Sequence, residues 1–252
     1  MINKEIITHV THWSHNTFSF RTTRNYPNKF NNGEFTMIGL EQENKNIMRA
    51  YSIASANHES HLEFLSIKVK DGPLTSKLQN IKIGDEILIN SKSTGTLVID
   101  YLNPGRNLYL ISTGTGLAPF MSIIKDPETY ERFDKIILTH TVSNPAQLAY
   151  LEELTSFNKD WNLITKGKFI YFNTVTQFKW SNTGRITEWI KNGKLHPTLG
   201  CEPIDSDLDR AMICGSLGLN QDLMGYFKSI GMKEGNTSIP GEFVIEKAFV
   251  EK

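Results

Sequence analysis

Residues 112–119, with the sequence Ser-Thr-Gly-Thr-Gly-Leu-Ala-Pro, form a glycine-rich turn between a predicted buried strand and a predicted helix. Glycines at such a turn let backbone amides approach a phosphate, and the positive end of the following helix favours its negative charge. The motif lacks the third glycine of the full dinucleotide fingerprint, and the next strand ends without the usual acidic residue. It indicates phosphate binding, although a tight turn without a ligand remains an alternative.

A second group of chemically useful residues, Arg49, Tyr51 and Ser52, lies on one predicted strand. An arginine suits a pyrophosphate, a tyrosine ring can stack on a flat ring, and a serine hydroxyl can donate to a ring nitrogen. Alternation puts Arg49 and Tyr51 on one face and Ser52 on the other, unless the strand ends or bends there. An ordinary barrel strand with a surface arginine explains the same residues.

The cysteines and histidines predict no metal centre. Cys201 and Cys214 are the only cysteines, too few for an iron–sulfur cluster or a cysteine-rich zinc site, and we expect both to be reduced thiols. Of His9, His12 and His15, the second faces away from the other two on a strand. Cys214 ends a predicted parallel strand, where open sheets bind ligands, but a small buried residue is the simpler interpretation.

The elements that position these residues change in kind along the chain. Up to about residue 100, short apolar or alternating runs predict strands over 5–10, 17–22, 33–40, 48–54, 61–69, 85–90 and 96–99, with one helix over 74–80. Strands at this spacing predict an antiparallel barrel or sandwich.

Beyond residue 105, predicted strands alternate with predicted helices. The strands cover 108–112, 135–141, 168–175 and 210–214, and the helices pass through 121–124, 146–157, 185–191 and 221–229. This alternation is typical of a parallel sheet covered by helices. We therefore expect two domains, residues 1–102 and residues 103–252.

Composition excludes several classes of function. The 252 residues carry 27 basic and 27 acidic side chains, which argues against a broad nucleic-acid surface. No apolar run approaches the roughly 18 to 20 residues that span a bilayer, and the first residues lack an apolar signal core. We expect a cytoplasmic, monomeric protein that binds neither membranes nor nucleic acids.

Over essentially its whole length the chain resembles the bacterial branch of the ferredoxin/flavodoxin–NADP reductase family. The resemblance rests on five ordered motifs, residues 49–52, 64–78, 114–120, 214–216 and 245–252. It implies an N-terminal antiparallel β-barrel that holds FAD and a C-terminal Rossmann-like α/β domain that binds NADP(H).

The activity that this resemblance implies is hydride transfer between NADP(H) and FAD at flavin N5, with single electrons exchanged with an acidic carrier, ferredoxin or flavodoxin. A basic set could contribute to carrier docking, although a solvated surface is equally compatible: Arg21, Arg24, Lys29, Lys45 and Lys68. Two alternatives remain: an NAD(P)H-dependent reductase of free flavins, quinones or an oxygenase component, and a flavin-binding redox sensor without turnover.

Roles for individual residues also follow from the resemblance. Arg49 would bind the FAD pyrophosphate, Tyr51 would flank the isoalloxazine, and Ser52 would lie near flavin N5. Cys214 would lie near the nicotinamide, and Phe249 would cover the flavin face, so the candidate catalytic set is Tyr51, Ser52, Cys214 and Phe249. The remaining implied cofactor-binding positions are Ala50, Ile67, Lys68, Val69, Leu74, Thr75, Ser76, Gly114, Thr115, Gly116, Ala118, Pro119, Gly215 and Ser216.

The chain departs from the family where the 2′-phosphate of NADPH would bind. Arg185 is present, but Ser143 and Gln177 stand where close relatives usually carry arginine. A charged hydrogen bond contributes about 1.5 to 3 kcal/mol, so two losses weaken NADPH binding by one to several powers of ten. We expect an NADP(H) enzyme that discriminates less sharply against NAD(H).

Overall fold

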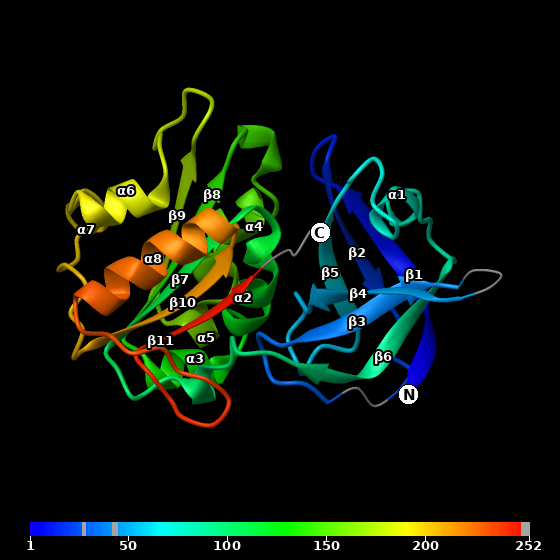
Figure 1. Cartoon of the computed structure of the whole chain (residues 1–252), viewed down its shortest axis with the longest axis horizontal. Coiled ribbons are helices and arrows are strands. Elements are labelled where there is room, and N and C mark those ends of the chain that lie inside the picture. The colour runs from blue at the N-terminus through cyan, green and yellow to red at the C-terminus, as the bar shows by residue number, and fades with distance from the viewer. Residues whose placement is uncertain (27–28, 42–44, 248–252) are drawn as a thin grey trace.

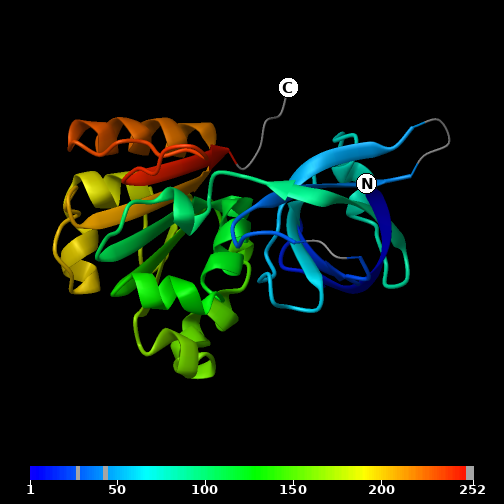
Figure 2. The same cartoon turned by 90° about the horizontal axis from the view of Figure 1, so that it is seen from below.

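The computed structural model describes residues 1–26, 29–41 and 45–247. It consists of two lobes that lie side by side in both views (Figures 1 and 2). The N-terminal lobe contains one antiparallel sheet of six strands in the order β4-β3-β6-β1-β2-β5. Its strands are β1 (Ile2–His12), β2 (Thr17–Thr22), β3 (Phe35–Leu40), β4 (Ile47–Ser52), β5 (Leu62–Ile67) and β6 (Glu86–Thr94).

Alternating side chains build the core of this barrel lobe. Along β1, Asn3, Glu5 and Ile7 are buried and their neighbours are exposed or half-buried. A bridge between Ile53 and Phe64 links the chain after β4 to β5, the strand at the opposite edge of the sheet. The short helix α1 (Thr75–Leu78) packs against the same core. The predicted antiparallel barrel is confirmed. Because the sheet closes on itself, its two edges are not left open.

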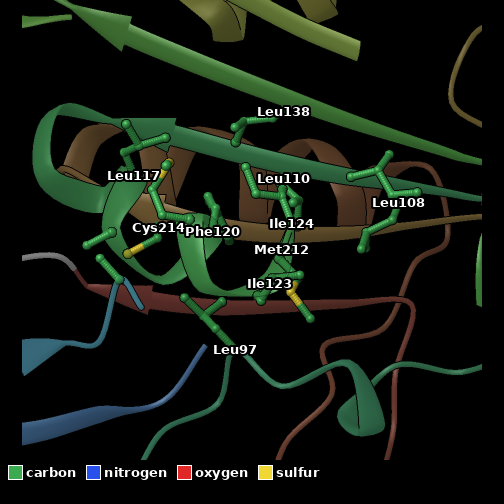
Figure 3. Close-up of a cluster of buried hydrophobic side chains, with 14 of the residues drawn as sticks. Leu97, Leu108, Leu110, Leu117, Phe120, Ile123, Ile124, Leu138, Met212 and Cys214 are labelled. Carbon is green, nitrogen blue, oxygen red and sulfur yellow. The ribbon is translucent and has the colours of Figure 1, made fainter. Parts of the chain in front are cut away.

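The strand predicted over residues 96–99 is wrong. This segment leads into a 3₁₀ helix, η1 (Ile99–Tyr101), and pairs with no strand of either sheet. Leu97 is buried in the core of the second lobe, in the same cluster as Ile123 (Figure 3). The apolar residues of the segment 96–99 are therefore explained by contact between the lobes. A local sequence pattern cannot distinguish such a contact from the pairing of a strand in a sheet.

The second lobe is a parallel sheet of five strands in the order β11-β10-β7-β8-β9. Its strands are β7 (Asn107–Thr113), β8 (Lys135–Val142), β9 (Phe169–Val175), β10 (Asp209–Gly215) and β11 (Phe243–Lys247). Its helices are η2 (Gly114–Leu117), α2 (Ala118–Ile123), α3 (Pro127–Arg132), η3 (Pro145–Gln147), α4 (Leu151–Asp160), α5 (Asn162–Thr165), α6 (Ile186–Lys191), α7 (Leu195–Leu199) and α8 (Leu217–Ser229). The predicted parallel α/β sheet is confirmed.

Helices cover both faces of this sheet. One cluster packs α2, α3 and α4 against residues such as Leu110 and Met212, and the other packs α6, α7 and α8 against Tyr109 and Ile213. Every residue of β10 is buried. A sheet covered on both faces presents only its edges and the ends of its strands to a ligand.

The helix predicted over residues 146–157 is divided in two. The 3₁₀ helix η3 ends at Gln147, and Tyr150 adopts a left-handed φ of 58° before α4 begins. Tyr150 packs on Trp13 of the barrel lobe with ring centroids 4.7 Å apart, and its hydroxyl donates to Glu63 Oε1 at 2.8 Å. These contacts between the lobes account for the strained turn.

Glu63 is the centre of a charged contact between the lobes. Its other carboxylate oxygen accepts a hydrogen bond from Arg21 Nε at 3.0 Å, and the residue is 3% exposed. Burial alone would raise its pKa, but His61, Arg21, Lys125 and the Tyr150 hydroxyl together lower the pKa to about 2. The carboxylate is therefore ionised and well supplied with partners where the two lobes meet.

Candidate active site

The order of strands in the parallel sheet reverses at β7. The chain passes from β7 to β8 and β9 on one side, and then to β10 and β11 on the other. The loops after β7 and β10 therefore diverge at the carboxyl ends of their strands, the place where open α/β sheets bind ligands. A cavity of about 670 Å³, here called the switch-point cavity, lies there. The predicted residues that line it are Ile67, Gly114, Thr115, Ser143, Arg185, Gly215 and Ser216.

The loop after β7 is fixed by close contacts with the loop after β10. The backbone amide of Ser216 donates to Thr113 Oγ1 at 2.9 Å. A Cβ atom on Gly116 would lie 2.1 Å from the carbonyl oxygen of Cys214, so no larger residue fits there without movement of the backbone. The absence of a side chain at position 116 therefore permits the close packing of the two loops.

A second cavity of about 560 Å³, here called the barrel cavity, lies between the barrel lobe and the end of β11. The predicted residues that line it are Arg49, Ala50, Tyr51, Ser52, Val69, Leu74, Thr75, Thr115 and Ala118. The structure thus brings together residues from β4, from the start of α1 and from the glycine-rich turn, which are far apart in the sequence.

Tyr51 presents a fixed ring to the barrel cavity. Its ring lies edge-on to Phe64, its hydroxyl shares a 2.9 Å hydrogen bond with Ser66 Oγ, and burial raises its pKa. Arg49 is exposed and pairs with no carboxylate among the described residues. A planar wall and an available cation are the features that an aromatic ring system with a phosphate group requires.

Glu246 contributes a carboxyl group to the wall of the barrel cavity. It lies in β11, paired in register with Cys214 of β10, and its Oε2 has no hydrogen-bond partner among the described residues. Burial raises its pKa to about 7, the backbone amide of Thr96 acts in the opposite direction, and Glu34 raises it further. A buried carboxyl oxygen without a partner is a polar atom that a bound group can satisfy.

The barrel cavity and the switch-point cavity meet. Thr115 and Leu65 line both of them, Thr115 from the glycine-rich turn and Leu65 from β5. A group held in one cavity can therefore contact a group held in the other at these two residues. Such an arrangement suits a transfer between two bound molecules, because the transfer then needs no diffusion step.

Six predicted positions line neither cavity: Lys68, Ser76, Gly116, Pro119, Gln177 and Cys214. Lys68 Nζ instead donates to the carbonyl of Ser14 at 3.4 Å, and the amide of Ser76 donates to the carbonyl of Gly72 at 3.1 Å. Gln177 is exposed. Phe249 lies outside the described residues, so its expected role on the flavin face stays a prediction.

Cys214 is packed in the hydrophobic core. It is 1% exposed and belongs to the cluster that contains Leu117 and Phe120 (Figure 3). Burial, and next the neighbouring Glu246, raise the pKa of its thiol well above the ordinary range. The expectation that this thiol lies near the nicotinamide stays a prediction, and this packing favours the simpler interpretation, a protonated core residue.

Sequence reasoning missed several residues of the cavity walls. Those of the switch-point cavity include Asn16, Thr17, Gln147, Thr176, Thr187 and Asp222, and those of the barrel cavity include Phe35, Thr96, Ile245, Glu246 and Lys247. Asn16 and Thr17 come from the opposite lobe, and no local motif marks them. The tail at residues 245–247 was part of the family motif, which could have pointed to these three positions.

Comparison with known proteins agrees with this arrangement. The family model described as an oxidoreductase FAD-binding domain matches residues 4–97, and the one described as an oxidoreductase NAD-binding domain matches residues 110–224. In the described part of the chain, no three His, Cys, Asp or Glu residues are grouped to hold a metal ion, and no helix is long and apolar enough to cross a membrane. The first matched range lies in the barrel lobe, and the second covers most of the parallel-sheet lobe but ends before β11.

Three relatives are similar over nearly the whole chain. The ferredoxin–NADP reductase of Azotobacter vinelandii is 49% identical over 100% of this chain and 99% of its own length. The flavodoxin/ferredoxin–NADP reductase of Rhodobacter capsulatus is 48% identical, over 98% and 93%. The crystal structure of a ferredoxin NADP+ reductase from Neisseria gonorrhoeae with bound FAD and NADP superposes with a TM-score of 0.91 at 28% identity, over 98% and 99%. With its two lobes, its two adjoining cavities and these relatives, the chain belongs to the ferredoxin–NADP reductase family of oxidoreductases.

Proposed function

We propose that the protein carries electrons between NADP(H) and a small carrier protein, a ferredoxin or a flavodoxin, through a bound FAD. The observation that carries this proposal is the meeting of the barrel cavity and the switch-point cavity at Thr115 and Leu65. The relatives named ferredoxin–NADP reductase, with identities up to 49% over the whole chain, support it. FAD, when bound, supplies the redox chemistry, since it accepts an electron pair from a nicotinamide and releases electrons singly.

The residues of the barrel cavity fit FAD. In this proposal Arg49 binds the pyrophosphate, the fixed ring of Tyr51 flanks the isoalloxazine, and Ser52 donates toward the flavin ring. The backbone amides of Leu74 and Thr75 add donors for the pyrophosphate, while that of Ser76 is already engaged with Gly72. The protein thereby orients the ring and excludes water from it.

The switch-point cavity is the proposed site of the nicotinamide nucleotide. Arg185 is exposed at the start of α6 and lines the cavity, so it can bind the 2′-phosphate with charge-assisted hydrogen bonds. The Ser143 hydroxyl donates to Gln147 Oε1 at 2.7 Å, and both of these side chains, which line the cavity, are uncharged. We infer that NADP(H) is used with a weaker preference over NAD(H) than two further arginines would give.

We also propose residues 1–102 and 103–252 as the two functional domains. The two family models, which cover residues 4–97 and 110–224, fall within these limits. The junction between the proposed domains is the site, because β11 of the second lobe supplies Ile245, Glu246 and Lys247 to the barrel cavity. We propose that the monomer is the functional unit.

An acidic carrier would dock where positive charge surrounds the flavin. Lys247 is exposed and lines the barrel cavity, so it suits this role. Two members of the basic set predicted from the sequence are engaged within the protein instead. Arg21 pairs with Glu63, and Arg24 donates to the carbonyls of Asn57 and Glu59.

The proposal is tested by anaerobic stopped-flow spectroscopy of the FAD-loaded protein. Addition of NADPH should bleach the flavin absorbance, and subsequent addition of oxidised ferredoxin or flavodoxin should restore it. The same experiment with NADH measures the nucleotide preference, for which we expect a kcat/KM ratio below about a thousandfold. Absence of bleaching with both nucleotides would refute the reductase function and favour a sensor, and bleaching that only free flavins or quinones reverse would refute the carrier assignment.

A further inference from the structure

His140 is a buried histidine that the proposed function does not use. It lies near the end of β8, is 1% exposed, and pairs in register with Ser112 of β7 and Asn173 of β9. Its Nε2 lies 3.0 Å from the carbonyl oxygen of Gly114, and its Nδ1 has no partner among the described residues. A buried ring nitrogen without a partner destabilises a protein, so an apolar residue would serve the core better than this histidine.

The tautomer of His140 follows from its surroundings. Burial lowers its pKa to about 4, which the hydrogen bond with Gly114 only partly opposes, so the ring is neutral near pH 7. A neutral imidazole carries one proton, and a carbonyl oxygen can only accept. The proton is therefore on Nε2, which donates to Gly114.

The carbonyl of Gly114, the first residue of η2, has two donors: the Leu117 amide, its i+3 partner in this 3₁₀ helix, and the ring of His140. Gly114 has a left-handed φ of 54°. Glycine has little steric preference between positive and negative φ, so this conformation is not fixed by the residue itself. The residues on either side are held by other means, Thr113 by its bond from the Ser216 amide and Gly116 by its packing against Cys214. The hydrogen bond from His140 is the side-chain contact that ties this peptide group to β8.

Fixing this carbonyl also fixes the next amide. The described peptide bonds are all trans, and in a trans peptide the carbonyl and the following N–H point in opposite directions. With the Gly114 oxygen held toward β8, the N–H of Thr115 points away from β8. Thr115 is the residue that lines both cavities, and as an early residue of η2 its amide has no acceptor within that helix.

We propose that His140 is a positioning residue for nucleotide binding: its Nε2–H holds the Gly114 carbonyl so that the Thr115 amide is presented to an acceptor oxygen of the dinucleotide. The proposal rests on the proposed function, because it assigns the switch-point cavity to a nicotinamide nucleotide. His140 itself touches neither cavity and acts through the peptide group. The benefit of such an anchor is preorganisation, since the ligand then need not order the loop.

Two substitutions with side chains of similar length separate the effect of the hydrogen-bond donor from the effect of the space that the ring fills. His140→Gln can place an amide N–H near the position of Nε2, whereas His140→Met fills similar space without a donor. Tyr130→Phe is the matched control, because it removes another buried hydrogen bond to a backbone carbonyl of the same lobe, from Tyr130 Oη to Ile124 at 2.8 Å. Tyr130 lines neither cavity.

The measurement is calorimetric titration of each oxidised, FAD-loaded protein with NADP+, which involves no turnover. We expect His140→Met to raise the Kd by about five- to tenfold, the equivalent of one ordinary hydrogen bond, with FAD content unchanged. His140→Gln should recover most of that affinity, and Tyr130→Phe should bind as the unchanged protein does. Unchanged binding by the methionine variant, or equal losses with methionine and glutamine, would overturn the proposal.

A second measurement needs no variant. Nitrogen-15 NMR of the imidazole in the unchanged protein should show His140 protonated on Nε2, and a proton on Nδ1 would overturn the proposal even if His140→Met fails to fold. A failure of the proposed function has a different signature, because the unchanged protein would then show no NADP+ binding at all.

Discussion

The largely buried Glu246 makes a quantitative prediction about stability and pH. Its pKa is raised from an ordinary value near 4.5 to about 7 in the folded protein. A folded-state pKa above the unfolded one means that the folded protein binds more protons between these two values, so its stability falls as the pH rises through this range. A shift of this size lowers the free energy of unfolding by about 3 kcal/mol. This loss is fully developed above pH 7 and nearly absent at pH 4.5.

The perturbation is Glu246→Gln, which keeps the shape of the carboxyl group and removes its ionisation. At each pH, the quantity of interest is the unfolding free energy of the variant minus that of the unchanged protein. This difference should be about 3 kcal/mol larger at pH 8.5 than at pH 4.5. The assay is urea unfolding of the FAD-free proteins at both pH values, because a bound group that satisfies Glu246 Oε2 would itself shift the pKa of this carboxyl. The matched control is Glu131→Gln, in which an exposed carboxylate of α3 is replaced and the difference should be small.

The comparison of the two pH values isolates the electrostatic effect, because any difference in packing between Gln and protonated Glu is present at both. A stability difference between Glu246→Gln and the unchanged protein that is the same at pH 4.5 and pH 8.5 would refute the reasoning. It would mean that the carboxylate finds a partner, or water, that lowers its pKa to the ordinary range.

Three further predictions concern the other contacts. Tyr150→Phe should lower the unfolding free energy at pH 7 by about 1 to 3 kcal/mol in urea unfolding, because the buried Glu63 carboxylate loses a donor; an unchanged midpoint would contradict this. Ser143→Arg should raise the ratio of kcat/KM for NADPH over NADH by about tenfold or more, and a ratio that does not change would place the 2′-phosphate elsewhere. Arg49→Ala should weaken FAD binding by about tenfold or more in equilibrium dialysis, and undiminished affinity would exclude a pyrophosphate contact.

Much of the fold could be predicted because its signals are local. The strand over residues 17–22 is found with the predicted bounds, and the glycine-rich turn lies where β7 ends and η2 begins. Period-two alternation and a buried run followed by glycines each report on neighbours in the sequence. The elements with this kind of pattern were therefore placed within a few residues.

The errors lie where a distant contact decides the local structure. Leu97 is apolar because it packs on the second lobe, and Tyr150 breaks a helix because it reaches Trp13 and Glu63 across the junction.

The helix α3 was missed although Asp126 caps it and Pro127 begins it, a start signal that was present in the sequence. For the site, the family motifs supplied most of the barrel cavity, but no motif could place Asn16 opposite Gln147, whose side chains are joined at 3.3 Å.

The position of β11 has a consequence for how such a protein can be rearranged. Its hydrogen bonds belong to the parallel sheet, where it pairs with β10, yet it runs toward the barrel lobe (Figure 1) and its last residues wall the barrel cavity. A cut between the lobes therefore separates the first half of the chain from part of its own binding site. The two halves therefore cannot be exchanged independently. A chimera that joins this barrel to the second domain of another protein keeps a complete cavity only if that domain has an equivalent final strand.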